Sequence, residues 1–474
     1  MFKKKKSAEE LEKELIIACK NRKEYEVKHL LKSKRINPNC QDNDGKTPLH
    51  IACYKGYPRV MKKLLKNKRI EVNFQDQYGQ TPLHIACFNG YTFVEKMLLE
   101  DKRIEINKPD YNGCTPFWIA CRKERIQSLK LLLNENEVNV NQTNKYGQSP
   151  FFIACEKGKV EVVRLLLNDK RVDVNKSDEN DITPLYIACQ KEKLEIVKLL
   201  LNNERVDVNY NGNKNKETPL WIACKKDRVD VVKLLLKHSR VDVNKGNKNE
   251  ETPFYMVCEK AKVGIVKLLL NDQRVDVNKP NIDGQTPLYI TCQNNWINVV
   301  KILLSEQRID INKGNETPLY VACYFGFFEV AENLLKDERV DANKGNKNGE
   351  SPFWITCRNG QNKAVEVLLK HPRVDVNLAN KDGETPFYIA CWNEKIEIVK
   401  LLLKDERVDI NKPNNDGQTP LFIACFFGHL RIVECILRSG REINLSQKNK
   451  FGETALDIAK ERKREMESIK RLEK

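Results

Sequence analysis

The segment TPFYIACWNEKIEIVKLLLKDERVDIN, at residues 385–411, decides the fold. Thr385 can accept hydrogen bonds from the free amides at the start of a helix. Pro386 fits the first helical turn, where its missing N–H costs nothing. These two residues therefore predict a short helix over residues 387–391.

A second helix is predicted directly after the first. Its apolar residues lie at offsets that form one stripe on a helix of about 3.6 residues per turn, and they are Ile396, Val399, Leu402 and Leu403. The residues Arg-Val-Asp-Ile-Asn at 407–411 predict a short extended piece, and Asn-Asn-Asp-Gly at 414–417 provides a turn. One unit therefore consists of two helices and a finger-like turn.

This unit recurs along the whole chain. Its Thr-Pro or Ser-Pro pair is repeated with prolines at positions 48, 82, 116, 150, 184, 219, 253, 287, 318, 352, 386 and 420. The spacing is 34 residues, except for 35 before Pro219 and 31 before Pro318. A fixed period of roughly 20 to 50 residues indicates stacked units that cannot bury their apolar faces alone. The sequence predicts a solenoid of about fourteen units.

Composition agrees with an array. The chain has 474 residues, of which 40% are hydrophobic and 31% are charged, and this length exceeds what one compact core usually holds. No apolar run approaches the roughly 20 residues of a membrane-spanning helix. Residues 1–7 pass from lysines into a charged stretch without the apolar segment of a signal peptide. We therefore expect a soluble protein that is not secreted.

The 83 basic and 66 acidic residues leave a net charge of +17. Such an excess is typical of proteins that contact nucleic acid, acidic membranes or acidic proteins. Here it is spread out, because most units contain a charge pair in Arg-Val-Asp, as at 171–173 and 274–276. Only Lys3–Lys6 and Lys460–Arg464 are clearly basic segments.

The repeated motif resembles the ankyrin repeat. The residues that carry the resemblance are DGKTPLHIA at 44–52 and YGQTPLHIA at 78–86, and the similarity extends over about residues 10 to 470. The resemblance implies an all-α repeat solenoid of antiparallel helix pairs with short β-hairpin fingers, stacked into a curved, elongated array.

One departure from the family concerns repeat length. Ankyrin repeats usually have one residue fewer and end the second helix with Gly-Ala, whereas LLLNDKRVDVN at 165–175 carries an extra residue. Asn168, Asn202 and Asn271 follow the leucines of three units, and asparagine tolerates the left-handed conformation. We predict that these residues are left-handed C-caps. Only Gly440 restores the usual family form.

The resemblance and the spacing divide the chain into a basic lead-in (1–10), an N-terminal capping repeat (11–44), twelve repeats (45–446) and a C-terminal capping repeat with a basic helix (447–474). The twelve repeats span about 45–78, 79–112, 113–146, 147–180, 181–215, 216–249, 250–283, 284–314, 315–348, 349–382, 383–416 and 417–446. Ser7-Ala8-Glu9-Glu10 predicts a capping box. The finger after Asn312 is three residues short, which indicates either locally altered stacking or a tolerated deletion.

Cysteine occupies one position in thirteen units, namely 19, 53, 87, 121, 155, 189, 224, 258, 292, 323, 357, 391 and 425. Neighbouring helices lie about 8 to 10 Å apart, which is too far for a disulfide, and metal-ligand spacing with a paired histidine is absent from the sequence. We interpret these cysteines as small buried residues. Cys40, Cys114 and Cys435 lie outside this register. So many unpaired thiols fit a reducing compartment, so we expect a cytoplasmic location, with the nucleus as an alternative.

A ring follows each Thr-Pro-Leu, Thr-Pro-Phe or Ser-Pro-Phe, at His50, His84, Trp118, Phe152, Tyr186, Trp221, Tyr255, Tyr289, Tyr320, Trp354, Tyr388 and Phe422. The family usually has histidine here, with hydrogen bonds within and between units. We interpret the rings as packing between units in preference to a ligand site.

The sequence contains no phosphate-binding loop, metalloprotease motif or nucleophile elbow. We therefore predict no enzymatic activity, no catalytic residues, no cofactor and no metal.

Ankyrin repeat proteins usually bind partners on the concave face, through finger tips and the end of the first helix. The resemblance therefore directs attention to the two residues after each repeated cysteine. In the last third of the chain these positions become aromatic, with one arginine, and such residues are enriched in binding hot spots. The candidate partner-binding residues are Tyr324, Phe325, Arg358, Trp392, Phe426 and Phe427. The alternative is that these rings only pack over adjacent helix ends.

The function predicted from these observations is a monomeric protein-protein interaction scaffold. An alternative is binding of nucleic acid or an acidic membrane surface through the two basic ends. A third class, a sensor of small molecules in pockets between units, has no specific residue in its favour.

Overall fold

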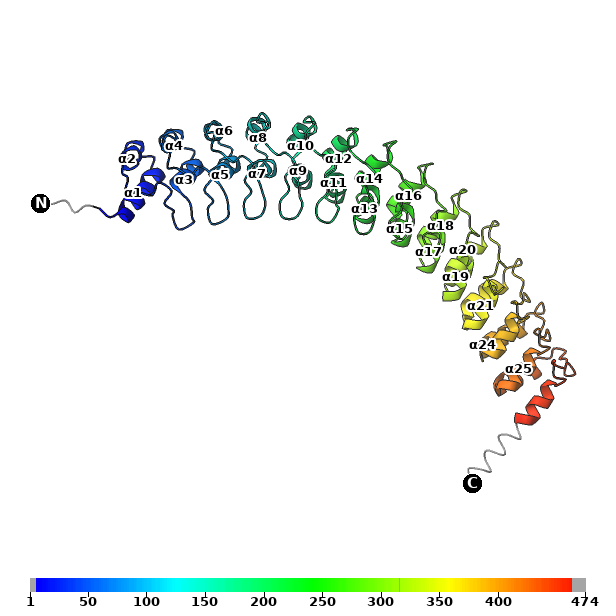
Figure 1. Cartoon of the computed structure of the whole chain (residues 1–474). Coiled ribbons are helices and arrows are strands. Elements are labelled where there is room, and N and C mark those ends of the chain that lie inside the picture. The colour runs from blue at the N-terminus through cyan, green and yellow to red at the C-terminus, as the bar shows by residue number, and fades with distance from the viewer. Residues whose placement is uncertain (1–5, 315, 463–474) are drawn as a thin grey trace, which may run out of the picture. The chain divides into compact units, whose positions relative to one another are not determined.

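The computed structural model describes residues 6–314 and 316–462. The chain divides into two compact units, here called the first unit (Met1–Asp242) and the second unit (Val243–Lys474). Each helix pair with its finger is called a repeat from here on. Within the described ranges all regular secondary structure is helical, and no residue is assigned to a strand. Helix pairs repeat through each unit (Figure 1). The predicted all-α repeat solenoid is therefore confirmed, but the expected β-hairpin fingers are tight turns in which no described residue is assigned to a strand.

The helices of the first unit are α1 (Ala8–Lys20), α2 (Glu24–Leu30), α3 (Pro48–Lys55), α4 (Pro58–Leu65), α5 (Pro82–Asn89), α6 (Thr92–Leu99), α7 (Pro116–Lys123), α8 (Ile126–Leu133), α9 (Pro150–Lys157), α10 (Val160–Leu167), α11 (Pro184–Gln190), α12 (Leu194–Leu201), α13 (Pro219–Lys225) and α14 (Val229–Leu236).

The helices of the second unit are α15 (Pro253–Glu259), α16 (Val263–Leu270), α17 (Pro287–Gln293), α18 (Ile297–Leu304), α19 (Pro318–Phe325), α20 (Phe328–Leu335), α21 (Pro352–Asn359), α22 (Asn362–Leu369), α23 (Pro386–Trp392), α24 (Ile396–Leu403), α25 (Pro420–Phe427) and α26 (Leu430–Leu437). A further helical stretch occupies 455–462.

Within each compact unit, every first helix packs against its paired second helix and against the first helix of the neighbouring repeat. In the first unit, for example, α5 contacts α3, α6 and α7, while α6 contacts α4 and α8. Figure 1 shows the first helices and the second helices of this unit as two rows, with the fingers projecting beyond the first row. The core therefore runs continuously between the rows, because each helix pair is covered by its neighbours.

The first helices begin as their sequence predicts. In α23, Thr385 Oγ1 accepts a hydrogen bond from the backbone N–H of Tyr388 at 3.1 Å, and Pro386 occupies the first turn. Ser7 and Glu10 form the predicted capping box at the start of α1. Both starting signals are thus confirmed.

The apolar stripe of α24 is shifted from its predicted position. The fully buried side chains are Ile398, Val399 and Leu402, whereas Ile396 and Leu403 are half-buried. The helix is covered by α23 on one side and by α22 and α26 along its row. The buried face therefore centres on Val399, and the first and last residues of the helix lie at its margins.

The predicted left-handed asparagine C-caps are wrong. Asn168, Asn202 and Asn271 have φ values of −80°, −78° and −71°, in the right-handed region. The chain continues beyond each of them in a further turn. A left-handed residue is not needed, because the carbonyl groups at these helix ends accept hydrogen bonds from an arginine of the next repeat, as at Leu167 O, which Arg205 Nη2 contacts at 2.8 Å.

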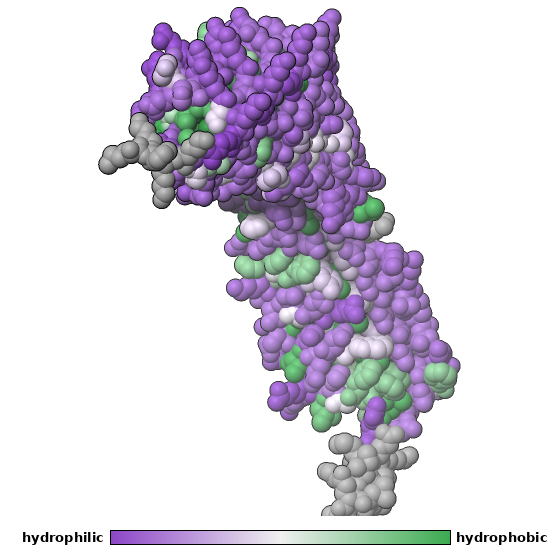
Figure 2. Space-filling view, turned by 60° about the vertical axis from the view of Figure 1, so that its left-hand side comes forward, coloured by the Kyte–Doolittle hydropathy of each residue, from purple (hydrophilic) through white to green (hydrophobic). Residues whose placement is uncertain are grey.

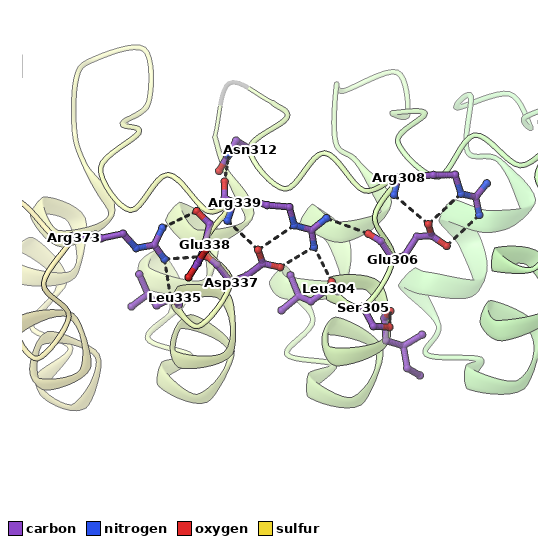
Figure 3. Close-up of polar contacts among 11 residues, drawn as sticks. Leu304, Ser305, Glu306, Arg308, Asn312, Leu335, Asp337, Glu338, Arg339 and Arg373 are labelled. Carbon is purple, nitrogen blue, oxygen red and sulfur yellow. Dashed lines mark hydrogen bonds and ion pairs between the residues drawn. The ribbon is translucent and has the colours of Figure 1, made fainter.

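Arg339 shows this arrangement in the second unit (Figure 3). Its Nη2 donates to Leu304 O at 2.7 Å, and its Nη1 donates to Glu306 O at 3.3 Å, both in the preceding repeat. Asp337 receives two further bonds, from Nε at 3.0 Å and from Nη2 at 2.7 Å. This guanidinium holds the pKa of Asp337 below its usual value. Arg339 therefore fastens one repeat to the previous one.

The acidic partner of the repeated arginine is not the aspartate of Arg-Val-Asp. Arg171 pairs with Asp169 at 2.8 Å, two residues before it. Asp173 instead accepts a hydrogen bond from the backbone N–H of Asn175 at 3.0 Å. The arginine and the aspartate of Arg-Val-Asp therefore do not pair with each other. The aspartate accepts a backbone hydrogen bond in its own repeat, whereas Arg171 also donates to Leu133 O of the preceding repeat.

Asparagines link the bases of successive fingers. Asn278 Nδ2 donates to Arg308 O at 2.6 Å, and its Oδ1 accepts from the backbone N–H of Asp310 at 2.8 Å. At the shortened finger, Asn312 makes the equivalent bonds to Arg339 O at 2.7 Å and from Asp341 N–H at 2.9 Å. The ladder therefore continues through this junction, which favours a tolerated deletion over altered stacking.

One polar pair interrupts the apolar core of the first unit. Glu95 in α6 is fully buried, and its Oε1 accepts a hydrogen bond from Ser128 Oγ in α8 at 2.7 Å. Within the described residues, its Oε2 has no hydrogen-bond partner. Burial raises the pKa of Glu95 to about 7. The same helix position holds apolar residues in other repeats, including Leu129 and Val163.

Candidate protein-binding surface

The row of rings that follow the Thr-Pro or Ser-Pro motif lies inside the array. Each ring except Tyr289 is buried, and Tyr289 is half-buried. Many of the polar ring atoms bond to the next repeat: His50 Nε2 lies 2.9 Å from Gln80 O, and Trp354 Nε1 donates to Glu384 O at 3.0 Å. The interpretation of this row as packing between repeats is confirmed.

The repeated cysteines are also core residues. All are free and buried except Cys425, which is half-buried. Outside the register, Cys40 and Cys114 are buried and Cys435 is half-buried. Burial raises the pKa of Cys323 to about 12, so this thiol stays protonated and unreactive at neutral pH. In the described part of the chain, histidine, cysteine and carboxylate side chains form no cluster that could hold a metal ion.

The six candidate binding residues lie at the C-terminal ends of four first helices. Tyr324 and Phe325 end α19, and Trp392 ends α23, while Arg358 occupies the last turn of α21. Phe426 and Phe427 end α25. The five rings are between 38% and 47% exposed. Each ring therefore has one covered side and one side that faces solvent.

The structure brings three of the predicted rings into one group. The Trp392 and Phe427 ring centroids are 5.2 Å apart, and Phe426 meets Phe427 edge-on, also at 5.2 Å. His429, which the sequence argument did not include, stacks on Phe427 at 5.8 Å. Its Nε2 lies 3.1 Å from Trp392 O. We call Trp392, Phe426, Phe427 and His429 the C-terminal aromatic group.

Tyr324 and Phe325 form a second, smaller group. Their rings meet edge-on with centroids 5.1 Å apart, and Phe325 stacks on Phe327 at 5.7 Å. Phe327 was also missed, because it lies in the turn between helices and outside the two positions considered. Extending those positions to the N-cap of the following helix would have identified both Phe327 and His429.

Arg358 belongs to the repeat between these groups, but its contacts stay within its own repeat. Its guanidinium lies 5.6 Å from the centre of the Trp354 ring, and its Nη1 is 3.9 Å from Glu350 Oε1. Asn359, the next residue, donates to Tyr324 O at 2.9 Å. The structure thus places Arg358 near the predicted surface without joining it to either ring group.

The surroundings of these groups are mainly polar. Figure 2 shows apolar side chains gathered toward the C-terminal end of the second unit, on a surface that is otherwise mostly hydrophilic. Arg462 extends over the Phe426 ring, 5.4 Å from its centre. Half-exposed rings on helix ends, bordered by cationic groups, have the composition of a protein-binding surface.

The two basic ends are only partly described. Lys6 pairs with Glu14, and residues 460–462 are helical. Lys3–Lys5 and residues 463–464 lie outside the described residues. Among the described helices, none is both long and apolar enough to cross a bilayer.

Comparison with known proteins gives consistent family matches. A family model described as ankyrin repeats (3 copies) matches residues 15–110, 93–178, 170–247, 206–281, 254–344 and 333–414. A second, described as ankyrin repeats (many copies), matches residues 394–437. No curated protein matches the sequence. Among solved structures, the chain is similar to the ankyrin repeat domain of Bcl-3, described as a unique member of the IkappaB protein family, with 25% identity over 47% of this chain and 96% of that chain and a TM-score of 0.43.

Proposed function

The chain belongs to the ankyrin repeat family, and from this premise we propose that it is a non-enzymatic scaffold that binds a protein partner through the C-terminal aromatic group. Ankyrin repeats generally serve as protein-protein interaction modules. The proposed surface lies at the ends of the first helices, on the side that is concave in ankyrin arrays. Tyr324 and Phe325 would extend the contact, and the free, buried cysteines support a cytoplasmic or nuclear site of action.

The observation that carries the proposal is the mutual packing of Trp392, Phe426 and Phe427 with part of each ring exposed. Their contacts with one another order the side chains before a partner arrives, so little side-chain entropy remains to be lost on binding. Large rings also provide apolar area that a partner can desolvate. The helices that hold them pack against neighbouring repeats, α23 against both α21 and α25.

Replacing Trp392, Phe426 and Phe427 together with alanine should reduce partner affinity at least about tenfold, because hot-spot side chains each contribute more than about 1 kcal/mol. The partner is first identified by affinity capture with the intact chain and mass spectrometry, then purified and titrated. The melting temperature should change little, since the rings are only half-buried.

The matched control is the double variant Tyr54→Ala/Phe88→Ala. These rings occupy the same repeat position in the first unit and are also partly exposed. This variant should keep full affinity. Unchanged binding by the triple variant, together with a large loss of stability, would mean that the rings serve only packing. A steep loss of wild-type affinity with added salt would favour the basic ends instead.

A further inference from the structure

Phe93 is an unusual residue at the outer surface of the first unit. It is the second residue of α6, and its side chain is 64% exposed. From α4 onward, the other second helices have a polar residue or glycine at this position: Arg59, Gln127, Glu161, Glu195, Asp230, Gly264, Asn298, Glu329, Lys363, Glu397 and Arg431. Only the first helix pair has another ring, Tyr25. Array packing therefore does not require an aromatic residue here.

Phe93 forms one wall of a groove between α4 and α6. The groove has a volume of about 860 Å³, and its apolar lining also includes Pro58, Leu65 and Met97. This volume falls in the range of about 300 to 1,000 Å³ that is usual for ligand sites. The groove is large enough to take a bulky apolar side chain together with its neighbouring backbone.

The rim of the groove is basic. Arg59, Lys62, Lys66 and Lys102 all line it. In the described part of the chain, the three lysines form no ion pair. Of the two acidic residues at the groove, Asp101 is already paired with Arg103 at 2.7 Å.

We propose that this groove binds an acidic protein segment that carries a large apolar side chain. The apolar side chain would lie against Phe93, and the flanking carboxylates would meet the basic rim. The basic rim favours a partner of negative charge. The exposed Phe93 ring offers a surface on which the partner's apolar side chain can pack, which a purely electrostatic contact would not need. The site is separate from the C-terminal aromatic group, so it stands independently of the function proposed above.

The test uses the full-length protein and short fluorescent peptides measured by fluorescence anisotropy. The first peptide has one tryptophan between glutamates in a Gly-Ser background. The comparison peptides replace the glutamates with lysines, or the tryptophan with alanine. We expect the acidic tryptophan peptide to bind best, and its affinity to fall when salt screens the rim.

The decisive variant is Phe93→Glu, which should lower the affinity for the acidic peptide about tenfold or more, equivalent to about 1.4 kcal/mol. Glutamate occupies the same position in α10 and α12, so the fold should tolerate it. The matched control Glu161→Gln, in α10, should bind as the unaltered chain does. Lys62→Glu/Lys66→Glu should shift preference from the acidic to the basic peptide.

The proposal is overturned if Phe93→Glu leaves affinity unchanged, or if the lysine peptide binds the unaltered chain as tightly as the acidic one. A DNA duplex or an anionic phospholipid vesicle that binds in place of the peptide, irrespective of Phe93, would also overturn it. If Phe93→Glu loses both peptide binding and helical circular dichroism, the variant Lys62→Glu/Lys66→Glu decides instead. If that variant still prefers the acidic peptide over the basic one, the proposal is overturned.

Discussion

Replacing Arg339 with alanine is expected to lower the stability of the helices around it by about 3 kcal/mol. The substitution removes hydrogen bonds to Leu304 O and Glu306 O, and it leaves the carboxylate of Asp337 without its guanidinium partner. Hydrogen bonds to charged groups contribute about 1.5 to 3 kcal/mol each, and exposure of the pair to solvent reduces the sum. The loss should be local, because each repeat contacts only its neighbours.

Native-state hydrogen exchange measures this effect at α18 and α20, the second helices of the two joined repeats. Arg339→Lys keeps the charge but offers no guanidinium fork, so it should recover only part of the loss. Glu338→Ala, which alters an exposed neighbour, is the control and should have little effect. A loss below about 1 kcal/mol in Arg339→Ala would contradict a fastening role for this side chain.

The double substitution Glu95→Val/Ser128→Val is expected to raise the free energy of unfolding by about 3 kcal/mol at pH 8. It replaces the buried polar pair with residues that occupy the equivalent positions in α10, Val163 and Val162. A buried carboxylate with one unpartnered oxygen is costly in its charged form. Removing the pair removes that cost, and the change of both residues leaves no unpaired hydroxyl.

The sign of the pH dependence follows from the raised pKa of Glu95. The folded chain binds this proton up to about pH 7, whereas an unperturbed glutamate releases it near 4.5. Stability from this group is therefore fully present below pH 4.5 and is lost as pH rises to about 7, by about 3 kcal/mol. Ser128 opposes the raised pKa by hydrogen bonding, and Arg125 opposes it by its charge. The nearby Cys87 thiol stays protonated because its own pKa is raised by burial.

Urea unfolding of the full chain at pH 5 and pH 8, followed by circular dichroism, checks this prediction. The advantage of the double variant should be small at pH 5 and large at pH 8. Glu161→Val, at an exposed position of α10, should show no such change with pH. An advantage of the double variant that is equal at both pH values would show that the Glu95 carboxylate does not titrate in the folded chain.

Features that occur in every repeat could be predicted from the sequence. Thr385 and Pro386 predicted the start of α23, and the cysteine and ring positions predicted buried contacts. Each of these residues acts mainly through its own helix, or in the same way in every repeat. The period therefore contains the information needed to place them.

Features that depend on contacts between particular repeats could not be predicted in the same way. The prediction of left-handed asparagine caps was wrong because Arg205, in the following repeat, donates a hydrogen bond to Leu167 O. The spacing of the repeats alone does not reveal this contact. Glu95 and Phe93 could have been found, since each departs from the residue type of the other repeats at its position.

The candidate surface was predicted as five aromatic residues and one arginine at equivalent positions of four repeats. The side-chain geometry groups Trp392, Phe426 and Phe427, and it directs Arg358 toward Glu350 within its own repeat. Such directions depend on rotamers and on the packing of neighbouring helix ends, which the repeat period does not specify. Whether the six residues contact a partner stays a prediction.

Hydrogen–deuterium exchange of the full chain, alone and with the purified partner, tests the central claim most directly. The account predicts that binding slows exchange in residues 390–395 and 424–431, which contain the C-terminal aromatic group, and more weakly in residues 323–328. Exchange in the first unit should stay as it is in the free chain. Protection confined to the first unit, or to the second helices α20 and α24 with none at the ends of α23 and α25, would contradict a partner site on the aromatic helix ends.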